Sequence, residues 1–281
     1  MITRFAPSPT GPLHLGHAYS ALLAHDMARA ASGTFLLRIE DIDQVRSKPE
    51  WQDLIYDDLR WLGLKWPEPV MLQSTRLPDY RSALARLDAA GLTYACHCTR
   101  RDVLEAASAP QEGAQHGPDG IVYPGTCRDL DLPRKGAAIR LRMDRAARLA
   151  GEISWWDGDG TGVGTARHID AATLVDTIGD VVLARRDMGT SYHLSVVVDD
   201  AAQQVTDVVR GRDLQDATPI HVVLQRLLGL PTPRYHHHRL IRDDAGRRLA
   251  KRDDARAIRS YRENGASPDD IRRMVGLTPA P

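Results

Sequence analysis

The chain has 281 residues, of which 42% are hydrophobic and 26% charged, enough to build one large domain or two modest ones around a sizeable core. Its 37 basic residues balance its 37 acidic ones, which argues against indiscriminate nucleic-acid binding and still allows a local basic face. The sequence shows no apolar run of transmembrane length and no apolar targeting segment, so we expect a cytoplasmic protein without a membrane partner. Three cysteines cannot all pair as disulfides, which in a reducing compartment leaves a metal site or free thiols.

The first predicted elements are a strand over 2–6 and a helix over 18–31, joined by a turn with three prolines and two glycines. A strand that leads into a helix N-terminus points backbone N–H groups at one spot, which suits a phosphate or a carboxylate. His14 and His17 lie about one helical turn apart, and Gly16 lets a ligand approach the backbone. Local chemistry alone favours a proline-rich loop with two surface histidines.

A second strand is predicted over 34–39, and it ends in the carboxylates Glu40 and Asp41. Strand, helix and strand open a parallel α/β sheet, whose ligands collect at the carboxyl ends of the strands. Glu40 is therefore either a ligand-binding carboxylate or a solvated one before a turn. Helices are predicted next, over 49–62 and 78–90.

Cys96 and Cys98 stand one residue apart, and Cys127 follows beyond a stretch with loop composition. This pattern is typical of a zinc knuckle that lacks its fourth ligand, although three free buried thiols are the competing interpretation. The candidates for the fourth ligand are nearby side chains with an oxygen or nitrogen donor: Tyr123, His97 and His116.

Residues 138–143 alternate polar and apolar side chains, the pattern of a half-exposed strand. A turn is predicted over 155–160, and another strand over 180–183. We therefore expect the segment 76–189 to be an insertion rich in antiparallel strands that carries the metal site.

An apolar run over 196–198 then leads to two aspartates, and a buried strand is predicted over 205–211. Arg210 stands at the carboxyl end of that strand, where it can pair with an anionic substrate group or with Asp213. A helix is predicted over 218–228. The three histidines at 236–238 alternate in direction on a strand, which disfavours a shared metal.

Near the C-terminus, residues 242–254 form a charged segment in which Lys251 is the one cation that is not arginine. A charge run is usually a solvated face, but a flexible ammonium group suits phosphates that move during a reaction. A final helix is predicted to be capped by Ser267, with Pro268 in its first turn and Asp270 completing a capping box.

Two motifs together resemble a known enzyme class. His14-Leu15-Gly16-His17 resembles the His-x-Gly-His signature of class I aminoacyl-tRNA synthetases in their glutamyl form. Residues 248–252 resemble the second, mobile signature of these enzymes, although Ala250 stands where serine is common, which predicts slower activity. Two signatures in the right order are more specific than either alone. Further matches to the glutamyl group lie at 4–8, 38–41, 196–200 and 209–211.

The resemblance implies an α/β fold in which 1–75 and 190–240 form a Rossmann-type catalytic domain with a parallel sheet. It also implies a zinc-bearing, acceptor-binding-like insertion over 76–189 and a signature loop with a short helical extension over 241–281. We expect no anticodon-binding domain. The chain therefore resembles the truncated group of this class, the glutamyl-Q tRNA(Asp) synthetases, which place glutamate on the queuosine base of tRNA(Asp).

The resemblance further implies roles for single residues, a structural zinc, and Mg²⁺ bound with ATP. The zinc ligands of the family match Cys96, Cys98, Tyr123 and Cys127. The glutamate pocket matches Arg4, Phe5, Ala6, Pro7, Ser8, Glu40, Tyr192 and Arg210. The ATP site matches His14, Gly16, His17 and Lys251, of which the two histidines and the lysine are the expected catalytic residues.

The expected partners are ATP, L-glutamate and queuosine-containing tRNA(Asp), and we expect a monomer. Three alternatives stay open. The chain is a synthetase fragment that charges the terminal adenosine of tRNA(Glu), a small-molecule nucleotidyltransferase of the same superfamily, or an inactive zinc-bearing module that binds tRNA.

Overall fold

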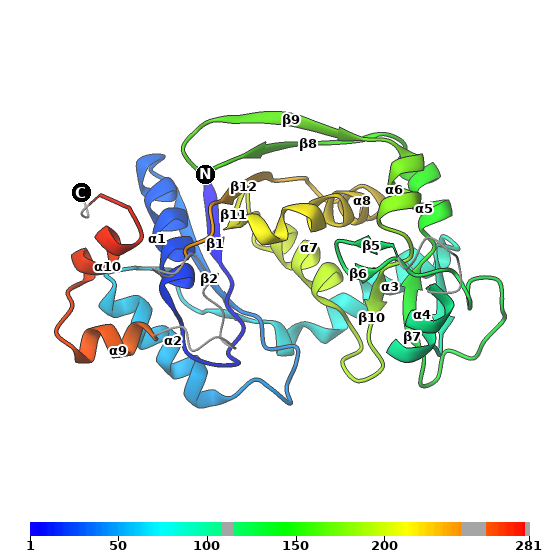
Figure 1. Cartoon of the computed structure of the whole chain (residues 1–281), viewed down its shortest axis with the longest axis horizontal. Coiled ribbons are helices and arrows are strands. Elements are labelled where there is room, and N and C mark those ends of the chain that lie inside the picture. Colours follow the sequence, from blue (N-terminus) through cyan, green and yellow to red (C-terminus); the bar gives the residue numbers. More distant parts are fainter. Residues whose placement is uncertain (108–114, 243–256, 279–281) are drawn as a thin grey trace.

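The computed structural model of the chain describes residues 1–107, 115–242 and 257–278 (Figure 1). Lys251 and the rest of the second signature lie outside these residues. Within the described ranges, none of the helices combines the length and the apolar character needed to cross a bilayer.

The centre of the molecule is a sheet of mostly parallel strands. Its strands are β1 (Ile2–Phe5), β2 (Thr34–Ile39), β3 (Met71–Leu72), β8 (Ile153–Gly158), β9 (Gly164–Ile169), β11 (Asp207–Gly211) and β12 (Arg234–His238). They are ordered β3-β2-β1-β11-β12-β8-β9, and all neighbours run parallel except the antiparallel pair β8 and β9. The predicted α/β fold with a Rossmann-type parallel sheet is therefore confirmed.

The hairpin of β8 and β9 was not predicted. It runs along the top edge in Figure 1, and β8 pairs in parallel with β12 although it lies within the segment 76–189. The turn predicted over 155–160 is wrong for residues 155–158, which belong to β8. Gly158, one of the two glycines that favoured a turn, instead leaves room for the Trp156 ring together with Gly164 of β9, because a Cβ on either would come within 2.1 Å of the ring.

Five helices accompany the central sheet. They are α1 (Leu15–Ala30), α2 (Pro49–Trp61), α3 (Leu77–Ala89), α7 (Tyr192–Ala202) and α8 (Thr218–Leu228). The helices predicted over 18–31, 49–62, 78–90 and 218–228 are thus confirmed to within one turn. The apolar run at 196–198 lies inside α7.

The C-terminal residues form α9 (Ile258–Glu263) and α10 (Pro268–Met274). The predicted capping box of α10 is confirmed. The Ser267 hydroxyl accepts from the Asp270 N–H at 3.2 Å, and the Asp270 carboxylate accepts from the Ser267 N–H at 2.8 Å. Both helices pack on the first half of the chain, since Ile258 shares a buried cluster with α1, β2 and α2.

A second, antiparallel sheet lies at the other end of the molecule (Figure 1). It consists of β10 (Val182–Ala184), β7 (Ala138–Leu141) and β4 (Thr93–Cys96), which confirms the strands predicted over 138–143 and 180–183. The elements around it are α4 (Arg100–Ala107), β5 (His116–Gly117), β6 (Gly120–Ile121), α5 (Met143–Ala150) and α6 (Ala171–Thr177). Buried Asp180 ties these pieces together by accepting hydrogen bonds from Tyr94, Arg128 and the Met143 N–H.

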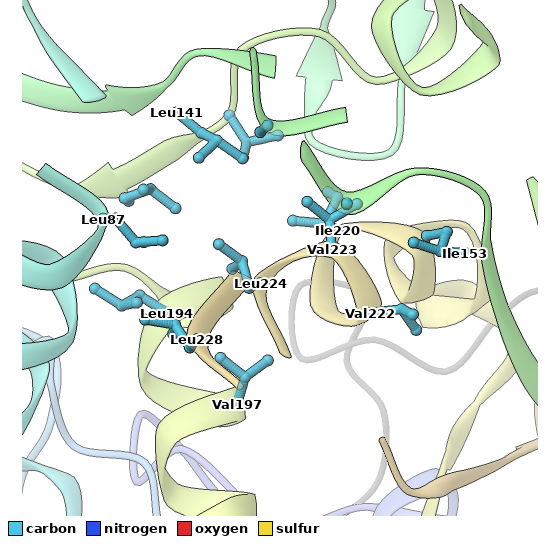
Figure 2. Close-up of a cluster of buried hydrophobic side chains, with 14 of the residues drawn as sticks. Leu87, Leu141, Ile153, Leu194, Val197, Ile220, Val222, Val223, Leu224 and Leu228 are labelled. Atoms are coloured by element: carbon cyan, nitrogen blue, oxygen red, sulfur yellow. The ribbon is translucent and has the colours of Figure 1, made fainter. Parts of the chain in front are cut away.

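The two sheets share one hydrophobic core. Figure 2 shows this cluster, in which side chains of α8 meet side chains from α3, α7 and β7. The labelled members include Leu224, Leu87, Leu194 and Leu141. Because β7 belongs to the small sheet, burial of this cluster fixes the small sheet against the central one.

Candidate functional site

The turn between β1 and α1 is closed by two histidines. The Nδ1 atom of His14 accepts from the Gly16 N–H at 3.1 Å, and the Nδ1 atom of His17 accepts from the His14 N–H at 3.2 Å. Together they form a capping box at the start of α1, with ring centroids 3.8 Å apart. Because both Nδ1 atoms accept, each neutral ring carries its proton on Nε2. Each ring therefore has an N–H donor of the kind that binds a phosphate oxygen.

A buried group of charges lies behind this turn, where β1, β2 and α7 meet. Arg38, which is fully buried, donates to Glu40 at 3.1 Å and to Asp200 at 2.7 Å. Arg4 donates to the same Asp200 carboxylate at 3.1 Å. The Glu40 N–H also donates to the Pro7 carbonyl at 3.0 Å, which joins the turn to the end of β2. The two arginines are therefore balanced by two carboxylates.

Burial raises the pKa of Glu40, although Arg38 and Arg4 act in the opposite direction. Burial also acts to raise the pKa of Asp200, but the attraction of Arg4 and Arg38 outweighs it and lowers that pKa. Asp200 thus stays ionised as the counter-charge of the two arginines.

Arg210 has a different kind of environment at the carboxyl end of β11. Its guanidinium donates to His237 Nε2 at 3.1 Å, to His221 Nδ1 at 3.1 Å and to the Thr218 hydroxyl at 2.7 Å. It also lies over the Tyr235 ring, 5.1 Å from the centroid. Burial and the nearby Arg210 charge lower the pKa of His221 well below its usual value. Arg210 is therefore surrounded by neutral acceptors.

A cleft of about 1330 Å³ opens next to these groups and extends to the small sheet. Ser8, Glu40 and Tyr192 line it on the side of the central sheet, and Cys98 and Tyr123 line it on the side of the insertion. Arg4 and Arg210 are buried, at 5% and 4% exposure. Burial raises the pKa of Tyr192, against the effect of the Arg210 charge. The structure thus brings five of the predicted site residues to one cleft, whereas the other described ones do not line it: Arg4, Phe5, Ala6, Pro7, His14, Gly16, His17, Cys96, Cys127 and Arg210.

The three cysteines come together as the sequence predicts. Their sulfur atoms all lie within 4.8 Å of one another, and those of Cys98 and Cys127 are 3.4 Å apart. The Tyr123 hydroxyl lies 3.4 Å from Cys96 Sγ and 3.3 Å from Cys98 Sγ. The Arg140 guanidinium stacks on the Tyr123 ring, 3.8 Å from its centroid. Four donor atoms from two distant segments therefore converge on one point.

This donor set fits a structural zinc site. Tetrahedral zinc with bonds of about 2.3 Å places its sulfur ligands about 3.8 Å apart, close to the spacing observed here. Of the candidate fourth ligands, Tyr123 is the one that meets the sulfurs, whereas His97 Nε2 lies 2.8 Å from the Pro133 carbonyl. Burial raises the pKa of the Tyr123 hydroxyl, and a bound cation would act in the opposite direction and favour its ionised form.

Sequence reasoning did not find the buried residues that surround Arg210. His221 had a detectable signal, because it is a polar residue between apolar neighbours on the buried face of α8. His237 belongs to the run 236–238 that the sequence analysis weighed only as a metal site, and Thr218 had no signal, since their role depends on contacts with a different strand.

Comparison with known proteins shows which family shares these features. Residues 1–279 match the family described as tRNA synthetases class I (E and Q), catalytic domain. The chain belongs to this family. A glutamyl-Q tRNA(Asp) synthetase of Rhodobacter capsulatus is 65% identical over 99% of this chain and 100% of that protein. One of Nocardia farcinica is 44% identical over 99% of this chain and 86% of that protein. Within the class I family, the chain is thus a member of the glutamyl-Q tRNA(Asp) synthetases.

Solved structures of class I synthetases share this fold. The crystal structure of glutamate-tRNA synthetase from Elizabethkingia anophelis superposes with a TM-score of 0.76 at 25% identity. It covers 99% of this chain, which spans 61% of that longer protein. Methionyl-tRNA synthetase from Mycobacterium tuberculosis, at 10% identity and a TM-score of 0.61, shares the fold alone.

Proposed function

We propose that this chain activates glutamate with ATP and transfers it to the queuosine base of tRNA(Asp). The observation that carries the proposal is a single cleft that has the Glu40 carboxylate and Tyr192 on its wall and the Arg210 guanidinium buried beside them. These charges are opposite to the ammonium and carboxylate groups of glutamate. The acceptor is the one named for the relative with 65% identity.

In the first step, an oxygen of the glutamate α-carboxylate attacks the α-phosphorus of ATP, and pyrophosphate leaves. No side chain becomes covalently attached, so the protein acts by positioning the reactants and stabilising charge on the phosphates. The Nε2–H groups of His14 and His17 would donate to phosphate oxygens, and Gly16 would let them approach α1. Mg²⁺ would accompany ATP and offset its negative charge. Lys251, outside the described residues, is proposed for the same phosphates.

In the amino-acid pocket, Glu40 and Tyr192 would hold the ammonium group and the backbone of glutamate. Arg210 would meet a carboxylate directly, because its own partners are uncharged. Arg4 is proposed for the other carboxylate, although it also pairs with Asp200. The stretch from Phe5 through Ala6 and Pro7 would position Ser8 on the cleft wall.

In the second step, a hydroxyl oxygen of the modified base would attack the carbonyl carbon of the glutamyl-adenylate, so that an ester bond forms, the bond to the phosphate breaks, and AMP and the hydroxyl proton are released. The arginines that line the insertion side of the cleft are suited to tRNA phosphates: Arg100, Arg140, Arg185 and Arg186. Zinc on Cys96, Cys98, Tyr123 and Cys127 would hold this side in shape. We propose the domains 1–75 with 190–240, 76–189 and 241–281, with the β8–β9 hairpin of the middle segment extending the central sheet. We also propose a cytoplasmic monomer.

The acceptor can be tested directly. We expect radiolabelled glutamate to be incorporated into purified tRNA(Asp) that contains queuosine, and not into the same tRNA with guanine at that position. Equal charging of both tRNAs would refute the acceptor. Charging of tRNA(Glu) in a parallel reaction would support the alternative of a synthetase fragment instead.

The histidine turn can be tested with Gly16→Ala. A Cβ at this position would lie 3.0 Å from His14 Cε1 and 3.1 Å from Nδ1, so the ring must shift by a few tenths of an ångström from its capping position. We expect the rate of glutamate-dependent pyrophosphate exchange to fall about tenfold, the cost of roughly 1.4 kcal/mol at the transition state. Thermal unfolding should change little, because alanine favours the helix. An exchange rate equal to that of the wild type would contradict the role of His14.

A further inference from the structure

Arg210 carries a positive charge that its nearest hydrogen-bond partners do not cancel. Its three acceptors are a hydroxyl, Thr218, and two imidazoles, His221 and His237. Burial and Arg210 itself lower the pKa of His237 to about 4, and the pKa of His221 is also lowered, so both rings are neutral near pH 7. A buried charge with neutral partners is costly. The arrangement favours a bound anion next to Arg210.

The hydrogen bonds of His221 and His193 can run in one direction only. An arginine is always a donor, so His221 must accept with Nδ1, 3.1 Å from Arg210, and must carry its proton on Nε2. That Nε2–H lies 3.1 Å from Nδ1 of His193, which therefore accepts. The proton of His193 is then on Nε2, which lies 3.3 Å from a carboxylate oxygen of Asp119. The chain of contacts runs from Arg210 to Asp119 in a fixed order.

This chain crosses from one part of the fold to another. Arg210 lies on β11 and His221 on α8, whereas Asp119 lies in the turn between β5 and β6 on the insertion side. Asp119 and His193 both line the cleft. A shorter branch reaches Arg210 from β8, where Asp157 lies 2.6 Å from His237 Nδ1. Both branches end in a carboxylate: Asp157 contacts an imidazole that meets Arg210 directly, and Asp119 contacts another such imidazole through His193.

We propose that Asp119, His193 and His221 form an ordered relay that positions Arg210 for a carboxylate of the amino-acid substrate. The inference rests on the proposed function, because that function assigns Arg210 to this carboxylate. The relay fixes the plane of the Arg210 guanidinium through neutral hydrogen-bond acceptors. The positive charge of Arg210 therefore remains available to pair with the substrate carboxylate. Asp119, His193 and His221 are positioning residues, since they act through Arg210.

Asp119 is the relay residue whose substitution should disturb folding least, because its side chain is 46% exposed. In Asp119→Ala, we expect the KM for glutamate in pyrophosphate exchange to rise about tenfold, the scale of one hydrogen bond in a charged network. The kcat and the KM for ATP should stay within about twofold. Asp119→Asn keeps an acceptor for His193, so its KM for glutamate should stay within about threefold of the wild type. An unchanged KM in the alanine variant, or equal effects of both variants, would overturn the relay.

A second measurement does not depend on activity. Nitrogen-15 chemical shifts of the imidazole rings report which nitrogen carries the proton, and His221→Asn and His193→Asn variants assign the signals. We expect both histidines of the wild type to be protonated on Nε2 and not on Nδ1. A proton on Nδ1 of His221 would overturn the relay even if exchange is active. Absence of glutamate-dependent exchange in the wild type, with the expected tautomers present, would instead refute the proposed function.

Discussion

A Cys127→Ser variant is expected to lose its bound metal. Serine has the same shape but does not supply a thiolate, and the remaining ligands Cys96, Cys98 and Tyr123 would leave one corner of the tetrahedron open. Structural zinc sites contribute on the order of 10–16 kcal/mol of apparent binding free energy, so loss of one ligand has a large effect. Zinc measured by mass spectrometry after dialysis should fall from about one atom per chain to below about one tenth.

Loss of the metal should also destabilise the local structure of the insertion, residues 76–189, around the cysteines. The sulfur and phenol groups form a buried cluster with Tyr94, against which Val103 and Leu132 pack. We expect proteolysis near residues 98–127 to become faster in the variant. His97→Ala is the matched control, because this ring contacts the Pro133 carbonyl and should not affect zinc content. Metal-free wild-type protein, or full zinc content in Cys127→Ser, would rule out the site.

An Asp200→Asn variant is expected to be destabilised by about 3–5 kcal/mol, the cost of leaving a buried ion pair with one partner. Asp200 is the shared counter-charge of Arg4 and Arg38, and its side chain is only 7% exposed. The amide cannot balance two guanidinium groups in this position. Urea unfolding followed by tryptophan fluorescence measures the difference. The matched control is Asp187→Asn, whose pair with Arg185 is exposed and should be worth at most about 1 kcal/mol.

The pH dependence of the same variant has a definite sign. The pKa of Asp200 is lowered in the folded state, so its ionised form stabilises the protein above the unfolded carboxyl pKa of about 3.9. That stabilisation is lost as the pH falls from there through the lower pKa of the folded state. The wild type should therefore lose stability below about pH 4 and the difference from Asp200→Asn should narrow. A constant difference down to pH 2 would show that Asp200 does not act through its charge.

Local patterns were enough for most of the elements. The helix Thr218–Leu228 and the strand Thr34–Ile39 lie where the sequence predicts them, because periodicity and end signals act within a few residues. The same reasoning found the capping box at Ser267. It was wrong at 155–158, where Gly158, which suggested a turn, instead accommodates the Trp156 ring on a strand. A glycine can serve a turn, or it can leave space for a neighbouring side chain. The sequence alone does not distinguish the two uses, because the neighbour is known only from the folded structure.

In the candidate site, too, some features follow from local sequence and others from the tertiary structure. By itself, the sequence determined the histidine turn, the Cys-x-Cys pattern and the place of Arg210 at a strand end, because each depends on residue types at short spacing. The tertiary structure decided between Tyr123 and the two histidines that residue spacing left open as the cysteines' partner. Only the tertiary structure showed that Asp200 balances Arg4 and that the partners of Arg210 are neutral. Arg4 and Asp200 are 196 residues apart in the chain. Pairs that distant meet only when the strand and the helix that carry them, β1 and α7, pack together, and no local pattern records that contact.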